Sequence, residues 1–331
     1  MNADVQLPAV SLVVCSRGRP QLLIETVESI LEGDEVPQEL IVIDQSDGVN
    51  HELAAKRSAR CDLRYVHMER TGVSLGRNEG VRLARHDLLV FTDDDVLVEP
   101  TWFGSIVRAQ IAEGERSLVV GRVVAGPAEQ PGSFMWDEND YDRRIVFEGR
   151  LDDDPLYPTN VSAYRSSLEA VGLYDERLGP GARFPCGEDN DLAFRLLEHG
   201  YRIVYVPGPV VIHRAWRPPE EFLSIKWRNA KGHGAFLAKH LSLRDRHMLS
   251  RLVRSIGIQT RRSAHSVRQD PELRREGLGH AVTAAGLTVG ATKWLVLETL
   301  PGAIRRARRG TREQSGHSKD GDPVRSRGSG A

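Results

Sequence analysis

Three consecutive carboxylates, Asp93, Asp94 and Asp95, follow the short apolar run at residues 88–91. Adjacent carboxylates repel one another, and a divalent cation such as Mg²⁺ or Mn²⁺ relieves that repulsion because it prefers oxygen ligands. Alternate side chains of an extended segment point the same way, so Asp93 and Asp95 could share one metal-bound ligand while Asp94 faces elsewhere. An acidic turn leading into the next helix explains the triplet equally well, since carboxylates favour helix N-termini.

A second acidic cluster, Glu188, Asp189 and Asp191, opens a helix that we predict over residues 189–199. One interpretation is structural, because the helix dipole favours acidic side chains in the first turn. The other is chemical, because an attacking hydroxyl must lose its proton and a positioned carboxylate can accept it. The sequence leaves both open.

Two basic groups accompany the acidic clusters. His213 ends the apolar run at residues 210–212, where a structural role is the default, although a neutral imidazole would also complete the ligand shell of a manganese ion. Arg77 lies near the start of a helix predicted over residues 74–84, where it would meet a nucleotide base or phosphate, or else face solvent. The chain lacks the dinucleotide fingerprint and the phosphate-binding GxxxxGK[ST] loop, which disfavours dehydrogenases and kinases.

The elements that must position these groups alternate along the chain. Short apolar runs are typical of strands buried on both faces, and residues 20–31 and 74–84 between them have helical spacing. This order predicts a doubly wound, mostly parallel sheet that binds ligands at the carboxyl ends of its strands. The aromatic-rich segment 126–158 is predicted to be a functional loop. We expect strands at residues 10–15, 40–43, 63–67, 88–91, 118–124, 161–164, 203–206 and 210–212.

Composition and charge divide the 331 residues into two regions. Hydrophobic residues make up 40% and charged residues 27%, as expected of a folded protein. Residues 1–215 carry 22 basic and 36 acidic side chains, whereas residues 216–331 carry 23 and 10. The acidic region suits a cation and the basic region an anionic surface. Three cysteines without metal-type spacing and an N-terminus without a secretory pattern favour a cytoplasmic location.

The basic region is predicted to be helical over residues 216–310 and disordered over residues 311–331. Its apolar segment 281–300 contains Lys293 and Glu298, so we expect a buried or membrane-surface helix rather than a bilayer span. Flanking arginines suit peripheral contact with the anionic inner face of a membrane, or equally a solvated helical bundle. Without zinc-finger spacing or an RNA-recognition motif, no nucleic-acid partner is expected.

Taken in order, five segments resemble the family-2 glycosyltransferases. They are residues 10–17, 41–48, 72–80, 91–95 and 187–195, and His213 lies where many members keep a metal-binding histidine. The resemblance covers residues 8–215 and implies an α/β, Rossmann-like GT-A fold with a mostly parallel sheet, here followed by a C-terminal helical extension. It implies an inverting transferase that uses a nucleotide-diphosphate sugar.

The resemblance also implies residue roles. Asp189 would be the catalytic base, with Glu188 and Asp191 supporting the acceptor side. Asp95 and His213 would hold Mn²⁺ or Mg²⁺. Arg17-Gly18-Arg19 departs from the Tyr or Asn of many relatives, which leaves the nucleotide open. Contacts to the nucleotide would come from Ser16, Arg17, Asp44, Arg77, Asp93 and Asp94.

The sequence therefore predicts a glycosyltransferase catalytic domain at residues 1–215 and a basic extension that contacts acceptor, membrane or another subunit. The frequency of donors in the family favours a UDP-sugar. The acceptor hydroxyl could belong to a glycan, a lipid-linked molecule or a small molecule, and a homo-oligomer is left open. The alternative is a noncatalytic module that binds nucleotide-sugars or glycans on the same fold.

Overall fold

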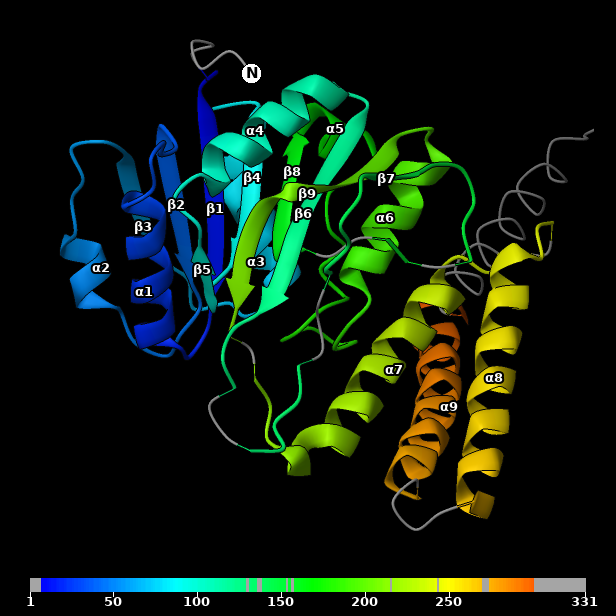
Figure 1. Ribbon diagram of the computed structural model, residues 1–331. Helices are drawn as coiled ribbons and strands as arrows, with labels where there is room; N and C mark the ends of the chain where they lie inside the picture. Colours follow the sequence, from blue (N-terminus) through cyan, green and yellow to red (C-terminus); the bar gives the residue numbers. More distant parts are fainter. Residues whose placement is uncertain are drawn as a thin grey trace, which may run out of the picture.

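A mixed sheet and a unit of three long helices make up the part of the chain that the structure describes (Figure 1). The computed structural model describes residues 7–300 except 129–130, 136–138, 153, 156–157, 215, 243 and 270–273. The predicted tail at residues 311–331 lies outside this range. The predicted domain boundary at residue 215 stays a prediction.

The first half of the sheet is parallel and lies in the order β3-β2-β1-β4. Strands β1, β2 and β4 are mostly buried because helices cover both faces, whereas β3 at the edge of the sheet is only partly buried. The strands of this half are β1 (Val10–Ser16), β2 (Glu39–Asp44), β3 (Asp62–His67) and β4 (Leu88–Asp93).

The second half of the sheet is mixed. The strand β8 (Asn160–Tyr164) runs antiparallel to both β4 and β6 (Ser117–Ala125), and β6 pairs in parallel with β9 (Arg202–His213). Two short strands, β5 (Val96–Val98) and β7 (Ile145–Phe147), pair antiparallel with β9. The two strands predicted at residues 203–206 and 210–212 are therefore parts of one strand, and the predicted loop 126–158 contains β7.

Helices cover the two faces of the sheet. One buried cluster packs α1 (Pro20–Leu31) and α4 (Trp102–Glu113) against the strands, and another packs α3 (Val73–Leu83) and α6 (Glu188–Glu198). Two short helices, α2 (His51–Ala55) and α5 (Arg165–Ala170), carry too little periodicity for the sequence to have revealed them. The predicted α/β fold is confirmed.

The C-terminal unit consists of three helices, α7 (Phe222–Lys239), α8 (His247–Gln269) and α9 (Arg274–Trp294), of which α7 and α9 run parallel and α8 runs antiparallel to both (Figure 1). A 3₁₀ turn (Pro219–Glu221) precedes α7, and a π-helical turn (Leu295–Thr299) follows α9. A third buried cluster joins Leu178 and Phe184 of the α/β part to these helices. The predicted helical extension is thus present and shares a core with the α/β part.

No helix within the described residues is both long and apolar enough to span a bilayer. Leu249 is 45% and Val253 62% exposed on α8, a helix that also carries the exposed Arg254. Peripheral contact with an anionic membrane stays a prediction.

Glycines let α7 and α9 approach closely. A Cβ added to Gly290 would lie 2.0 Å from the carbonyl oxygen of Lys231, and one added to Gly234 would lie 2.1 Å from that of Leu287. In both cases the added Cβ would clash with a backbone atom, which cannot move away by rotation as a side chain could. The two helices therefore require glycine at these positions, despite its low helix propensity.

Substitution of these glycines tests that requirement. We expect Gly290→Ala to lower the free energy of unfolding by about 1–3 kcal/mol, since the methyl group forces the backbones apart. The control is Gly257→Ala on α8, where an added Cβ meets nothing within 4 Å. Better helix propensity should make that variant more stable by about 0.5–1 kcal/mol. Thermal unfolding of both variants would contradict the argument if they shifted in the same direction.

Candidate active site

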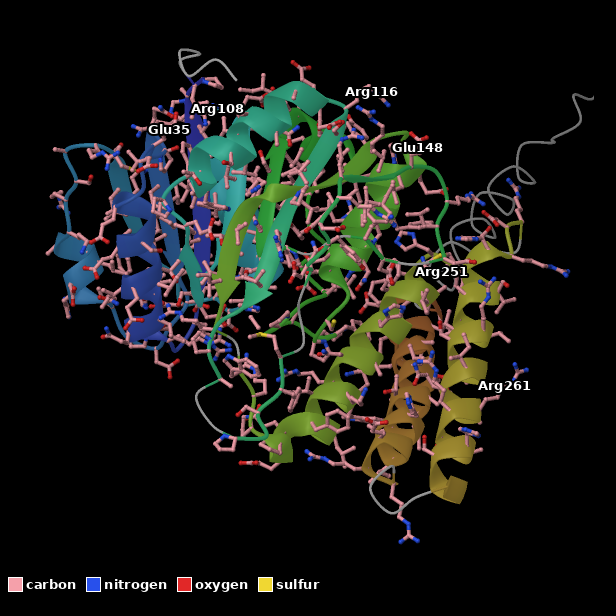
Figure 2. The ribbon with its side chains drawn as sticks, viewed as in Figure 1. Glu35, Arg108, Arg116, Glu148, Arg251 and Arg261 are labelled. Atoms are coloured by element: carbon pink, nitrogen blue, oxygen red, sulfur yellow. The ribbon has the colours of Figure 1, made fainter. Side chains whose placement is uncertain are left out.

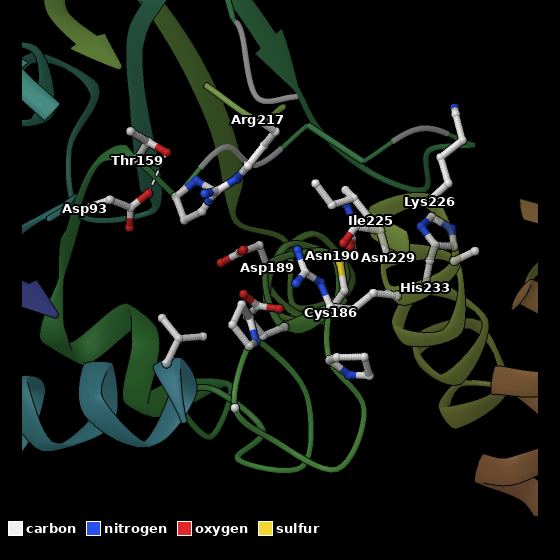
Figure 3. Close-up of a pocket in the computed structure, with 18 of the residues that line it drawn as sticks. Asp93, Thr159, Cys186, Asp189, Asn190, Arg217, Ile225, Lys226, Asn229 and His233 are labelled. Carbon is white, nitrogen blue, oxygen red and sulfur yellow. Dashed lines mark hydrogen bonds between the residues drawn. The ribbon is translucent and has the colours of Figure 1, made fainter. Parts of the chain in front are cut away.

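A cavity of about 830 Å³ opens where the carboxyl ends of β1 and β4 face α6 and the C-terminal helices. Asp93 and Arg217 lie on its α/β side, whereas Asn229 and His233 reach it from α7 (Figure 3). Of the predicted site residues, those that line it are Ser16, Arg17, Arg77, Asp93, Asp94, Asp95, Glu188, Asp189 and His213.

Two carboxylates and one imidazole gather at the strand ends. Asp93, Asp95 and His213 each offer a ligand atom, and these atoms lie within 4.8 Å of one another. Strand pairing produces this cluster: β5 begins at Val96, which pairs with His213, and the Arg214 amide donates to the Asp95 carbonyl at 2.9 Å. His213 Nε2 then lies 3.2 Å from Asp95 Oδ1. The donor set fits a Mn²⁺- or Mg²⁺-type cation that accepts oxygen and imidazole ligands.

Arg19, which the sequence analysis did not select, contacts the same acids. Its guanidinium donates to Asp94 Oδ1 at 3.1 Å and also to Asp95. Burial would raise the pKa of Asp95, but the hydrogen bond from His213 and the charges of His213 and Arg19 hold that pKa below its usual value. The sequence signal was the unusual Arg17-Gly18-Arg19 turn that follows β1.

The pKa of Asp94 is shifted in the opposite direction from that of Asp95. Its carboxylate is 5% exposed and accepts a hydrogen bond from Ser16 Oγ at 2.6 Å. Burial, followed by repulsion from Asp95, raises the pKa of Asp94 to about 6 even though Arg19 opposes both effects. The ionised form of Asp94 therefore costs the protein stability near neutral pH, because burial and like charge disfavour it.

Arg77 joins the two acidic clusters. It is 5% exposed, so it is not a surface arginine, and it donates to Asp189 at 2.9 Å and to Asp93 at 3.2 Å. Its helix α3 lies close against β1, since a Cβ on Gly80 would come within 2.3 Å of Val13 Cγ1. Close packing at glycine thus fixes Arg77 between acids separated by almost a hundred residues of chain.

Asp189 begins α6 at the cavity wall. Gly187 supplies the N-cap with a φ of 96°, a left-handed conformation that favours glycine, and a Cβ there would lie 2.9 Å from the carbonyl oxygen of Gly232 on α7. Burial raises the pKa of Asp189, and the neighbouring charge of Glu188 raises it further. Thr159, another residue missing from the sequence analysis, donates to Asp93 at 2.7 Å.

Two predicted site residues lie away from the described lining of the cavity. Asp191 is fully buried and contacts Lys239 at 2.6 Å, His240 at 2.7 Å and Arg195 at 2.8 Å. It therefore braces α6 against α7 rather than facing an acceptor. Asp44 is 2% exposed at the end of β2 and accepts hydrogen bonds from the Tyr65 hydroxyl and the Ser46 amide. Its predicted contact with the nucleotide stays a prediction.

Comparison with known families identifies this arrangement. Residues 8–234 match the family described as "Glycosyltransferase like family 2". The chain belongs to this family. The match spans the whole sheet, both acidic clusters and the first part of α7, so the site described above lies within the glycosyltransferase region.

Characterised relatives of this glycosyltransferase are distant. It is 29% identical over 226 residues to the glucosyl-dolichyl phosphate glucuronosyltransferase of Haloferax volcanii, a match that covers 64% of this chain and 71% of the relative. It is 27% identical over 188 residues to the pre-mycofactocin glycosyltransferase of Mycobacterium tuberculosis. That second match covers 53% of this chain but only 37% of the relative.

Solved structures confirm the GT-A fold. The mannosyltransferase PcManGT of Pyrobaculum calidifontis, in complex with GDP-Man and Mn²⁺, superposes with a TM-score of 0.56 and 17% identity, covering 87% of this chain and 89% of its own. TarS of S. aureus, residues 1–349, has a TM-score of 0.54 and 16% identity, covering 84% and 81%.

The raised pKa of Asp94 gives a prediction for the metal-free glycosyltransferase. We expect Asp94→Asn to increase the free energy of unfolding at pH 7–8 by about 1–3 kcal/mol, because the variant buries no third charge. The penalty is fully present above the folded pKa of about 6 and disappears as the pH falls below the unfolded value of 3.8. Thermal unfolding in chelator from pH 8 to pH 4 measures this, and a less stable variant at pH 8 would contradict it.

Proposed function

We propose that this glycosyltransferase moves a sugar from a nucleoside-diphosphate donor to an acceptor hydroxyl with inversion at the anomeric carbon. The observation that carries the proposal is the bridge by Arg77, which holds Asp189 across one cavity from Asp93 and its neighbours Asp95 and His213. A base and a cation site that line one cavity suit a single displacement.

The donor side would use the carboxylate–imidazole cluster. Asp93, Asp95 and His213 would hold the cation, which supplies positive charge to the departing diphosphate. Arg77 would add a fixed positive charge beside the same leaving group, and Ser16 and Arg17 line the cavity where the nucleoside would lie. Solved relatives in complex with GDP-Man and Mn²⁺, and with UDP, GalNAc and Mn²⁺, support a metal-assisted nucleotide-sugar reaction.

The acceptor side would use Asp189. Burial raises the pKa of its carboxyl, which makes the ionised form a stronger proton acceptor for an attacking hydroxyl. Arg77 keeps the carboxylate oriented, and Glu188 lies 3.9 Å from the same guanidinium. We assign the proton of the acceptor hydroxyl to Asp189, while Asp191 anchors the helix that carries it.

Substitution of Asp189 tests the proposed base. We expect Asp189→Asn to slow transfer by at least about 100-fold, because a positioned base contributes roughly 10²–10⁴. Nucleotide binding should stay nearly unchanged, since the amide preserves the shape of the site. Glu198→Gln, an exposed position on the same helix, serves as the control and should retain activity. A folded Asp189→Asn protein that has lost nucleotide binding would contradict the assignment.

Metal-dependent nucleotide binding tests the donor side. We propose UDP as the nucleotide and expect saturating UDP with Mn²⁺ to raise the unfolding midpoint by about 5–10 °C, from roughly 2.7 kcal/mol of linkage. GDP and dTDP should shift it less, and omission of Mn²⁺ should reduce the UDP shift. Asp95→Ala should lose the metal-dependent part, whereas Asp142→Ala, an exposed control, should keep it.

The outcome also separates the enzyme from a noncatalytic binding module. A module would show the nucleotide shift without sugar transfer to any acceptor. Absence of a shift with every nucleotide, with and without metal, would contradict the proposed donor site itself.

A further inference from the structure

The cavity continues past Asp189 into the seam between the three C-terminal helices. Each helix lines the cavity with one face. The lining residues of each helix are three or four positions apart and span two turns, about 10 Å along the helix axis. On α7 this face begins at Lys226 and continues through Asn229 to His233. The corresponding residues are Ser255, Gln259 and Arg262 on α8, and His280, Thr283 and Leu287 on α9.

Basic side chains meet at one end of this seam. Because the helices run up, down and up, the start of α7, the end of α8 and the start of α9 lie at the same end of the three-helix unit (Figure 1). These parts carry Lys226, Arg262 and His280. A Cβ on Gly279 would lie 3.0 Å from Lys226 Cδ, and His280 Nδ1 lies 2.6 Å from Gln259 Oε1, which ties α7 and α8 to the first turns of α9.

Two of these side chains, Lys226 and Arg262, carry the positive charge at this end, whereas the surroundings favour the neutral form of His280. Burial lowers the pKa of His280, and the positive charges of Lys226 and Arg262 lower it further, against the exposed Glu276. Within the described part of the chain, no carboxylate lies within 4.0 Å of the Arg262 guanidinium. Positive charge therefore exceeds negative charge here, whereas the other end of the cavity carries Asp93 and Asp189 with their acidic neighbours.

The two ends are separated by about two helical turns along α7. Gly232 contacts the backbone of Cys186 just before α6, so the level of His233 on α7 corresponds to Asp189. Lys226 lies two turns earlier, about 10 Å away. Ile225, Ala230 and Leu287 supply apolar surface to this stretch, and Gln259 and Thr283 supply hydrogen-bonding groups.

We infer that this basic end binds an anionic group of the acceptor, a phosphate ester or a carboxylate, while the acceptor hydroxyl reaches Asp189. The inference rests on the proposed function for the role of Asp189, but anion binding can be measured without turnover. Guanidinium and ammonium groups pair strongly with phosphate and carboxylate oxygens, and a partly buried site strengthens that pairing.

Binding of a simple sugar phosphate tests the inference directly. Glucose 1-phosphate would be titrated against the full-length protein and followed by phosphorus NMR, with glucose followed by proton NMR as the neutral control. A parallel arm would measure sedimentation with phosphatidylcholine vesicles that contain or lack phosphatidic acid, to distinguish a soluble phosphate from a lipid headgroup. The two test variants are Arg262→Gln, at an exposed position, and the double variant Lys226→Gln/Arg262→Gln.

The matched control is Arg261→Gln. Arg261 is the neighbouring residue on α8, carries the same charge and projects away from the other helices (Figure 2). We expect the double variant to weaken phosphate binding at least about tenfold in whichever arm the wild type binds, and the control to change it less than about twofold. Arg262→Gln alone should give an intermediate loss.

Two results would overturn the inference: no binding by the wild type in either arm, or equal weakening in Arg261→Gln and the double variant. Both are independent of the donor site, because UDP with Mn²⁺ should still shift the unfolding midpoint of every variant in this series. Loss of the nucleotide shift with intact phosphate binding would instead contradict the proposed function.

Discussion

The buried guanidinium of Arg77 is the interaction on which the site depends. A buried charge is costly unless opposite charges surround it, and Arg77 has Asp93 on one side with Glu188 and Asp189 on the other. Removal of any single partner would leave the remaining charges less well compensated. Arg77 is compensated only because it contacts both acidic clusters. The same contacts set the distance between the two clusters, so they determine both the charge balance and the geometry of the site.

The three consecutive carboxylates after β4 are not equivalent, because their surroundings differ. Asp95 receives positive charge from His213 and Arg19, which lowers its pKa, whereas burial and its neighbour Asp95 raise the pKa of Asp94. A protein selected only for stability would not place three acids at the end of one buried strand. In the proposed function a bound cation would relieve the repulsion among these acids, so stability and function would oppose each other here.

The C-terminal helices complete the cavity and do not simply extend the chain. Gly187 and Gly232 let the start of α6 approach α7 closely, and Gly234 and Gly290 do the same between α7 and α9. These contacts place a basic wall opposite the acidic strand ends. Residues 1–215 and 216–331 have opposite net charges in the sequence, and in the structure both regions contribute to the lining of one cavity.

The sequence by itself determined the α/β fold and most of its strands, because buried apolar runs and helical periodicity are local patterns. It also indicated that Asp93–Asp95 and Glu188–Asp189 lie at strand and helix ends. Helical geometry also indicates that Asp191 faces away from Asp189, since residues two apart on a helix point to opposite sides. Only tertiary structure decided that His213 pairs with Val96 and so reaches Asp95, and that Arg77 lies between two acidic clusters. Those facts depend on strand register and close packing at glycine, which residue types along a chain do not encode locally.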